Sequence, residues 1–228
     1  MQQRPKHPWL IQLPATGTAR TLWQLAGLAA ILLAGHMLGS WLTYGTFLGF
    51  EPTWLRAVRN QQNLANPIGT RNLEIFIRDI TGLGGIGILI LLVTGAFLGF
   101  GFASRWRHGL ILVATALSAI TTIEIFKRIM PRARPQIVPH LVTEINASFP
   151  SGHAAMSTVI YLMLAALLLQ TIREQRLRRL IWTIAIALPV AIGLSRLYLG
   201  VHWPTDIMGG WLFGTLWVLA AIRVLKLR

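Results

Sequence analysis

The chain has 228 residues, of which 54% are hydrophobic and only 12% are charged, and its mean hydropathy is +0.58. Soluble domains carry about 25% charged residues, so this composition excludes an ordinary soluble domain and predicts an integral membrane protein. The formal net charge of +14 comes from basic residues spread over the connectors between apolar segments, which argues against a nucleic-acid-binding surface, and the absence of cysteine excludes disulfides, thiol catalysis and thiolate metal sites.

Six apolar segments approach or reach the length of about 20 residues that a helix needs to cross the hydrocarbon core of a bilayer. They are residues 22–44, 81–102, 108–126, 153–171, 180–198 and 205–225. The sequence therefore predicts an all-α, polytopic membrane protein with six transmembrane helices. We expect a single membrane-embedded domain over residues 1–228, with a tail at residues 1–21. We expect no cleavable signal peptide, because the first apolar run lacks a clear cleavage site.

A polar connector at residues 45–80 separates the first two expected spans. Its apolar side chains recur at helical spacing and its charged side chains take other positions, the apolar ones being Leu73, Phe76, Ile77 and Ile80. This pattern predicts a short amphipathic helix that lies on the outer surface of the membrane or over the mouth of a cavity. A packed connector with no role in substrate handling is the alternative.

The basic residues select the orientation of the spans. One side carries 12 basic residues and one acid, whereas the other carries 9 basic residues and 6 acids. The 12 basic residues are Arg4, Lys6, Arg20, Arg105, Arg107, Arg173, Arg176, Arg178, Arg179, Arg223, Lys226 and Arg228. By the positive-inside rule this side is cytoplasmic. We therefore expect the tail at residues 1–21 to be cytoplasmic and the connector at residues 45–80 to face the periplasm or exterior.

Three polar blocks lie on the same, outer side of the predicted bundle. They are "KRIMPRARP" at residues 127–135, "SFPSGH" at residues 148–153 and "GLSRLYLGVHWPTDIMGG" at residues 193–210. Charged residues close to hydrocarbon are costly and mark functional sites, so residues 127–206 form the expected motif-bearing core with an outer-face active site. The patterns K-x6-RP, PSGH and SR-x5-H-x3-D resemble the type 2 phosphatidic acid phosphatase and haloperoxidase superfamily, and the six-span layout is similar to its membrane branch.

The residue types in these blocks suit a phosphate group. Fixed cations and backbone N–H groups stabilise the charge that phosphoryl transfer spreads over oxygen atoms. Lys127, Arg134 and Arg196 are the candidate cations, and an arginine fork can hold two phosphate oxygens. Ser151 and Gly152 precede a span, where unpaired N–H groups and the helix dipole bind anions. The alternative for these two residues is a plain helix start in which serine is the N-cap.

Two histidines and an aspartate are the candidate catalytic residues. Proline is favoured in the first helical turn, so we expect the sixth span to begin near Pro204, with Asp206 in reach of His202. A carboxylate on one ring nitrogen fixes the tautomer and makes the other nitrogen a better nucleophile. The family resemblance implies that His202 attacks phosphorus and forms a phosphohistidine. It also implies that His153 protonates the leaving group and then activates water.

Metal ligation is the competing interpretation of His153 and His202. A metal site would need further carboxylates or histidines at ligand spacing. The other histidine on the outer side is His140, and the nearby cations would repel a divalent ion. We therefore expect neither a metal nor another cofactor.

The resemblance implies a metal-independent lipid phosphatase whose partners are the bilayer and a phosphorylated lipid. Phosphatidic acid, phosphatidylglycerophosphate and undecaprenyl diphosphate are the expected substrate types. A lipid phosphotransferase fits the same residues, with an acceptor lipid in place of water. A vanadate haloperoxidase or a soluble acid phosphatase keeps the motifs, but six spans argue against both. A non-enzymatic anion or lipid transporter would need only the cations, so the two histidines and the aspartate argue against it.

Overall fold

The computed structural model describes residues 49–226, so the tail at residues 1–21 and the first expected span lie outside the described residues. In chain order the elements are α2 (Phe50–Ala57), β1 (Arg59–Asn60), β2 (Asn63–Pro67), α3 (Arg71–Gly82), α4 (Ile86–Phe102), α5 (Trp106–Ile129), α6 (Gly152–Leu168), α7 (Gln175–Tyr198) and α8 (Pro204–Lys226). The described chain is mostly helical, as the sequence predicts.

The antiparallel hairpin of β1 and β2 is an element that the sequence analysis did not predict. Two asparagine side chains stabilise its turn, because Asn60 Oδ1 accepts from the N–H of Gln62 and Asn63 Oδ1 accepts from the N–H of Ala65. Asparagine favours turns for this reason. The hairpin joins α2 to α3 within the connector at residues 45–80.

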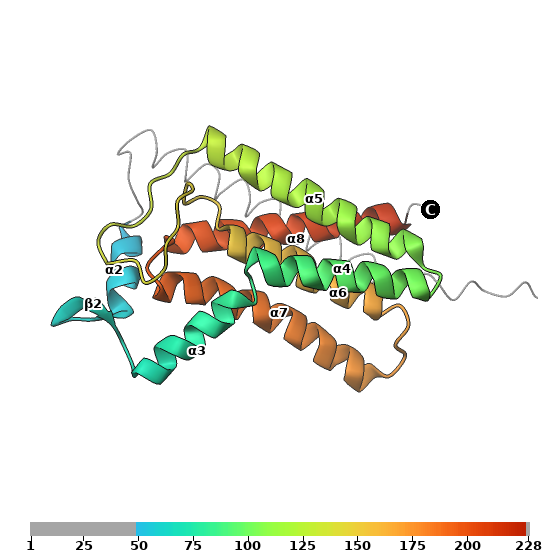
Figure 1. Cartoon of the computed structure of the whole chain (residues 1–228), viewed down its shortest axis with the longest axis horizontal. Coiled ribbons are helices and arrows are strands. Elements are labelled where there is room, and N and C mark those ends of the chain that lie inside the picture. The colour runs from blue at the N-terminus through green and yellow to red at the C-terminus, as the bar shows by residue number, and fades with distance from the viewer. Residues whose placement is uncertain (1–48, 227–228) are drawn as a thin grey trace, which may run out of the picture.

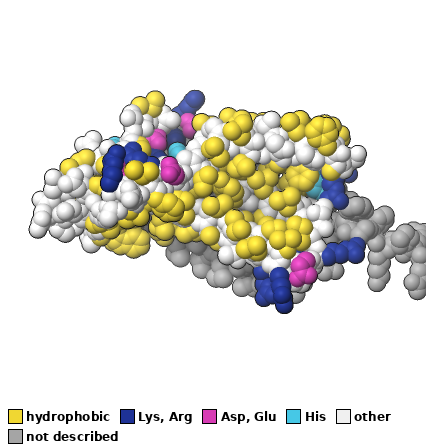
Figure 2. All heavy atoms as spheres, turned by 60° about the horizontal axis from the view of Figure 1, so that its bottom comes forward, with side chains coloured by type: hydrophobic (Ala, Val, Ile, Leu, Met, Phe, Trp, Pro, Cys, Tyr) yellow, Lys and Arg dark blue, Asp and Glu magenta, His cyan; other side chains and the backbone are white. Residues whose placement is uncertain are grey.

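The helices α4 to α8 coincide with five of the six expected spans, and they run side by side along the long axis of the molecule (Figure 1). Among the described residues, α5, α7 and α8 are each long and apolar enough to cross a membrane. The pair α3 and α4 also qualifies, with a bend of 45°, so the described part has three or four such spans. Figure 2 shows apolar side chains over the middle of one face and charged side chains toward both ends, which is the pattern of a multi-pass membrane protein.

The amphipathic helix expected within the connector is α3, which packs against α7. Thr70 caps it by accepting a hydrogen bond of 3.3 Å from the N–H of Leu73. The chain then bends through a glycine-containing turn into α4. A side chain at Gly84 in this turn would place its Cβ 2.5 Å from Ile192 and 3.3 Å from the ring of His153. The turn therefore lies directly against α7 and the start of α6.

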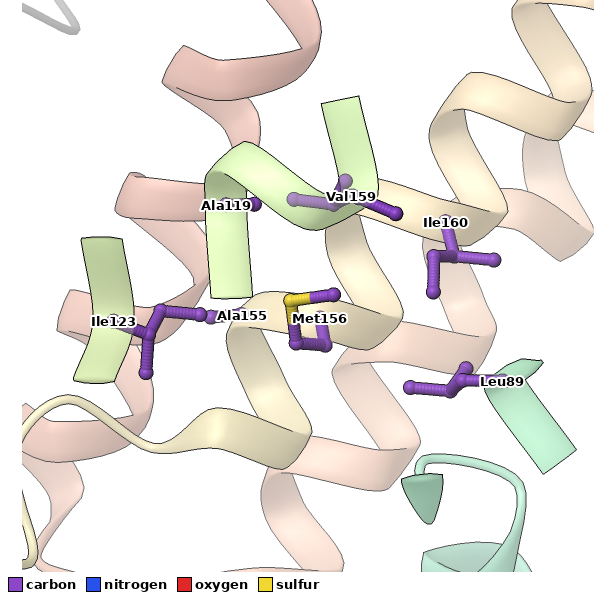
Figure 3. Close-up of a cluster of buried hydrophobic side chains, with 8 residues drawn as sticks. Leu89, Ala119, Ile123, Ala155, Met156, Val159 and Ile160 are labelled. Atoms are coloured by element: carbon purple, nitrogen blue, oxygen red, sulfur yellow. The ribbon is translucent and has the colours of Figure 1, made fainter. Parts of the chain in front are cut away.

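The helix α6 forms the centre of the bundle and packs against α5, α7 and α8. Gly210 and Gly214 allow α8 to approach it, because a Cβ there would lie 2.7 Å from Ser151 O and 2.6 Å from Ala155 O. Such small-residue spacing brings membrane helices together. Figure 3 shows the apolar side chains from α4, α5 and α6 that meet beside this contact, which include Leu89, Ala119, Ile123, Ala155, Met156, Val159 and Ile160.

Alternation of the helices brings four helix ends together at one end of the bundle. These are the carboxyl ends of α5 and α7 and the amino ends of α6 and α8 (Figure 1). The three polar blocks occupy the segments at these ends, so residues that are up to 79 positions apart in the core at residues 127–206 become neighbours. We call this the motif end. The turn between α4 and α5 and the connector between α6 and α7 form the opposite end.

Candidate active site

A short loop between α7 and α8 presents the His202 ring. The loop begins at Gly200, whose φ of +76° suits glycine, and a Cβ there would lie 2.6 Å from a guanidinium nitrogen of Arg59. The loop ends where α8 begins at Pro204, as the first-turn proline predicts. His202 Nδ1 lies 3.5 Å from Asp206 Oδ2 in the first turn of α8. Both side chains are buried.

Asp206 is held on several sides. Its Oδ2 accepts a hydrogen bond of 2.8 Å from the N–H of Trp203 and another from the hydroxyl of Ser148. Its Oδ1 accepts a hydrogen bond of 2.5 Å from Arg132. Ser148 Oγ also lies 3.4 Å from His202 Nδ1. The Nδ1 side of the ring therefore faces Asp206 and Ser148, and Nε2 points the other way.

Arg134 lies on the Nε2 side of the ring, with Nη1 3.3 Å from that nitrogen. Backbone carbonyls fix the guanidinium, because it donates to Val201 O and Asn146 O at 2.8 Å each. Arg196 at the end of α7 is almost fully buried and donates to Thr81 Oγ1 at 3.1 Å. Its Nε has no hydrogen-bond partner within residues 49–226. Arg134 thus lies beside His202 Nε2, and Arg196 has a buried donor without a partner in the described part of the chain.

Glu144 joins these two arginines. Its carboxylate forms an ion pair with Arg196 and another with Arg134 at 3.6 Å. Burial alone would raise the pKa of Glu144, but the charges of Arg196 and Arg134 lower it below its usual value, so this carboxylate is ionised. The side chain keeps a quarter of its surface exposed. An anionic group therefore already lies between the two arginines that the sequence analysis assigns to phosphate.

The amino end of α6 adds backbone donors. Ser151 caps the helix by accepting from the N–H of Ala154, and its own N–H donates to Asp206 O at 2.9 Å. In the described structure no hydrogen bond is assigned to the N–H groups of Gly152 and His153. The Nζ of Lys127 lies 3.8 Å from where a Cβ of Gly152 would be. Ser151 therefore supports the helix start, and the next two N–H groups and Lys127 are placed to meet an anion.

His153 belongs to the same group of side chains. Its ring interacts electrostatically with Arg196, Glu144, His202 and Lys127. It projects from the first turn of α6, whereas His202 lies in the loop between α7 and α8, so the two histidines come to Arg196 from different segments. We call this group the candidate phosphate site; its members are Lys127, Arg134, Ser151, Gly152, His153, Arg196, His202 and Asp206.

Burial keeps His202 neutral. The pKa of this imidazole is lowered to about 4, mainly by burial and also by the charges of Arg134 and Arg196, although the hydrogen bond and charge of Asp206 raise it. An uncharged ring has a lone pair on one nitrogen at neutral pH. With Asp206 on the Nδ1 side, that lone pair is on Nε2 and faces Arg134.

The family model described as the PAP2 superfamily matches residues 108–228, which is more than half of the chain. The chain belongs to the PAP2 superfamily. Its matched residues hold all three polar blocks. Among curated relatives, it is 32% identical over 145 residues to phosphatidylglycerophosphatase B of Bacillus subtilis, covering 63% of this chain and 71% of that protein. It is 33% identical over 122 residues to an undecaprenyl-diphosphatase of Sulfolobus acidocaldarius, covering 51% and 54% of the two chains.

Solved structures support the PAP2 assignment. A transmembrane PAP2-type phosphatidylglycerolphosphate phosphatase from Bacillus subtilis superposes with a TM-score of 0.75 at 25% identity, covering 88% of this chain and 94% of that one. LpxE of Aquifex aeolicus shares the fold, with a TM-score of 0.61 at 23% identity over 77% of this chain and 96% of that one. The curated relatives are phosphatases, and this PAP2 chain is accordingly a hydrolase of that kind.

Three features of this PAP2 site were not found by sequence reasoning. Ser148 lies inside the quoted block "SFPSGH", yet its bond to Asp206 has no signature in the spacing. Glu144 is the sole acid between Glu124 and Glu174, which is the signal that could have identified it. Arg132 lies inside the quoted block "KRIMPRARP", yet nothing in its spacing indicates that its guanidinium donates to Asp206.

Proposed function

We propose that this protein is a metal-independent lipid phosphatase that acts through a phosphohistidine at His202. The observation that carries the proposal is the orientation of this buried ring, with Nδ1 beside Asp206 and Nε2 beside Arg134. A binding site for an anion would need the cations alone, whereas a histidine oriented by a buried carboxylate supplies a nucleophile. The names of the curated relatives, both of which are lipid phosphatases, support this reading.

In the first step the phosphate of the substrate replaces the Glu144 carboxylate between Arg134 and Arg196. Lys127 and the N–H groups at the start of α6 hold the remaining oxygens, and together these donors stabilise the charge of the transition state. The lone pair of His202 Nε2 forms a bond to phosphorus, and the bond from phosphorus to the leaving oxygen breaks. His153 donates a proton to that oxygen, so the dephosphorylated lipid departs neutral at this atom.

In the second step the phosphohistidine is hydrolysed. His153, now without its extra proton, accepts one from a water molecule, and the water oxygen attacks phosphorus. The bond from phosphorus to Nε2 breaks, and its electron pair returns to His202. Asp206 stabilises the positive ring during both steps through the Nδ1 proton. Release of inorganic phosphate restores the starting state, in which Glu144 pairs again with the arginines.

The location of the site suits a substrate held in a membrane. The candidate phosphate site lies at the end of the bundle that the positive-inside rule assigns to the periplasm or exterior. A phosphate at the membrane surface reaches this end without leaving the bilayer. We therefore propose an inner-membrane enzyme with six spans whose substrate is phosphatidic acid, phosphatidylglycerophosphate or undecaprenyl diphosphate.

The experiment that tests this function is phosphate release from purified lipids by the full chain in detergent micelles. We expect release from at least one of the three lipids, equal rates with and without EDTA, and no release by the His202→Ala variant. Loss of activity in EDTA that Mg²⁺ restores would contradict the metal-independent mechanism. Full activity of His202→Ala would contradict the phosphohistidine.

A second measurement tests the orientation. Vanadate added outside intact spheroplasts reaches only sites on the outer face, and the cations of the candidate phosphate site should bind it. We expect inhibition of lipid dephosphorylation in intact spheroplasts equal to that in lysed ones. Inhibition that requires lysis would place the site on the cytoplasmic side.

A further inference from the structure

A chain of charged side chains, of which Glu51 is buried and Arg132 partly buried, continues from Asp206. Arg132 donates from Nη1 to Asp206 Oδ1 at 2.5 Å and from Nη2 to Glu51 Oε2 at 2.7 Å. Glu51 is fully buried, and it also accepts from the hydroxyl and the N–H of Thr205. A carboxylate, a guanidinium, a second carboxylate and an imidazole thus follow one another from Glu51 to His202.

Glu51 comes from a part of the chain that the family match does not include. It lies in α2, 81 positions before Arg132, and α2 contacts the amino end of α8 (Figure 1). The connector at residues 45–80 therefore places an acidic side chain beside the residues proposed to orient the nucleophile. Burying an unpaired carboxylate is costly, and the partners of Glu51 within the described residues are Arg132 and Thr205, which both lie next to Asp206.

The geometry limits what this pairing can do. Arg132 contacts Oδ1 of Asp206, whereas His202 faces Oδ2, and Glu51 contacts Arg132, so the path from this pair to the ring runs through Asp206. Their effect passes through Asp206, whose Oδ2 lies 3.5 Å from His202 Nδ1. That separation is longer than a normal hydrogen bond of about 2.9 Å. A small rotation of the Asp206 carboxylate therefore decides whether it forms a hydrogen bond with the His202 ring. Arg132 fixes one oxygen of this carboxylate, and Glu51 fixes Arg132.

The charges of Arg132 and Glu51 also act on Asp206. Arg132 alone would draw the negative charge of Asp206 away from the imidazole, because opposite charges interact strongly at such distances in a buried site. The second carboxylate, Glu51, offsets the guanidinium and leaves Asp206 able to stabilise the ring when it becomes positive. We propose that Glu51 and Arg132 are positioning residues for the reaction, which hold Asp206 in the orientation and charge state that His202 requires. This inference rests on the proposed phosphohistidine function.

The test compares Glu51→Gln, Arg132→Gln and the double variant, each as the purified full chain acting on phosphatidic acid in mixed micelles. We expect Glu51→Gln to lower kcat by about 10-fold to 100-fold, the range for supporting residues that orient a reactive ligand, with KM unchanged because no phosphate contact is lost. The double variant should be no less active than Arg132→Gln, since residues that act as one unit are not additive.

The pH profile separates positioning from a purely structural tether. Without Glu51 the full charge of Arg132 acts on Asp206, so the acidic limb of kcat/KM should move to lower pH. Without Arg132 it should move to higher pH. The charged and titratable groups that face His202 are otherwise the same in both variants: Asp206, Arg134, Arg196, His153 and Glu144. A structural tether would lower thermal stability in both variants and leave the acidic limb in place.

Glu74→Gln is the matched control. Glu74 is also a nearly buried carboxylate of the connector that holds two arginines, Arg71 and Arg78, but it has no bond to the candidate phosphate site. Its variant should keep the wild-type kcat and acidic limb. If Glu51→Gln does not fold, Thr205→Val removes one hydroxyl that holds Glu51 and should lower kcat in the same way, by a smaller factor.

The outcomes distinguish the two proposals. Wild-type kcat and acidic limb in Glu51→Gln or Thr205→Val, with His202→Ala inactive, would overturn the positioning role and leave the phosphatase function intact. An active His202→Ala would overturn the function itself. Opposite shifts of the acidic limb in Glu51→Gln and Arg132→Gln, with KM unchanged in both, are the result that the positioning role requires.

Discussion

The two ends of the helix bundle use the same residue types for different purposes. At the opposite end, His108 Nε2 pairs with Gln170 Oε1 at 2.9 Å and its ring stacks on Phe100. Arg178 donates to the carbonyls of Leu169 and Ile172, which closes the connector after α6. At the motif end, by contrast, His153, His202, Arg134 and Arg196 interact electrostatically with one another and with Glu144.

The partners of the charged groups explain this difference. Backbone carbonyls are permanent partners, so an arginine bound only to them is part of the fold. Arg196 at the motif end is paired instead with the partly exposed carboxylate of Glu144, which the substrate phosphate replaces in the proposed mechanism. A buried cation therefore indicates a binding site when another anion can take the place of the carboxylate that pairs with it. Variants at matched positions of the two ends test whether the ends differ in function.

The largest contrast is expected between the histidines of the two ends. His202→Ala removes the proposed nucleophile and should lower kcat on the order of 10⁴-fold or more, as loss of a catalytic nucleophile does. His108→Ala should keep kcat, since that ring contacts only structural groups. Phosphate release from phosphatidic acid by monodisperse protein measures both. Equal losses in the two variants would show that the ends do not differ in function.

A second contrast concerns the arginines. Arg196→Lys keeps the buried charge but loses the planar fork, so it should lower kcat/KM about 10²-fold to 10³-fold, the effect of removing an oxyanion donor. Arg178→Lys is the control at the opposite end, and its activity should equal that of the wild type. Steady-state kinetics on the same lipid distinguish the two variants. An active Arg196→Lys variant would remove this arginine from the transition state.

The third contrast is in the pH dependence of stability. Burial lowers the pKa of His202 to about 4 in the folded chain, whereas an unfolded histidine titrates near about 6.5. Between these values the unfolded state binds more protons, so the free energy of unfolding rises with pH. The contribution of the neutral ring is complete above pH of about 6.5, and roughly 3 kcal/mol of it is lost as the pH falls to about 4.

Unfolding by SDS in mixed micelles measures this dependence. The matched variant is His202→Gln, which cannot titrate and should show a smaller fall in stability over the same pH window. A wild-type protein whose unfolding free energy changes with pH no more than that of His202→Gln would contradict a neutral, buried His202.

The smallest effect is expected at Glu144, which lies between Arg134 and Arg196. Glu144→Gln removes the carboxylate that competes with phosphate, so the inhibition constant for vanadate should fall by about 10-fold, equivalent to about 1.4 kcal/mol. Glu174→Gln at the opposite end is the control, because Glu174 caps α7 through the N–H of Arg176 and faces no anion site. Weaker vanadate binding in Glu144→Gln would show that this carboxylate supports the site instead of competing for it.

The sequence predicts the parts of this molecule that repeat a general pattern. Apolar length locates α4 to α8, helical spacing locates α3, and the proline before the sixth span marks the start of α8 at Pro204. The residue spacing of the three blocks predicts a site at His202, Asp206 and their neighbours. Because α5 to α8 alternate in direction, these blocks must meet at one end, and the structure brings them together there.

The parts that the sequence could not predict depend on tertiary contacts between distant segments. Glu51 meets Arg132 only because α2 folds back onto α8, and nothing in the spacing of the connector indicates that contact. Glu144 is a single acid in a loop, so neither a periodic side-chain pattern nor a sequence motif marks it. The hairpin of β1 and β2 is too short for an alternating pattern, and its turn is set by asparagine side chains.

Trapping the covalent intermediate tests the central claim, that the oriented ring at the motif end is the nucleophile. The His153→Ala variant with p-nitrophenyl phosphate suits this purpose. The p-nitrophenolate leaving group needs no proton, so the phosphohistidine can form, but its hydrolysis lacks the base that His153 supplies. After an alkaline quench, mass spectrometry should find one phosphoryl group on the peptide that contains His202. Turnover with no phosphorylated histidine, or with the phosphoryl group on another residue, would contradict the account.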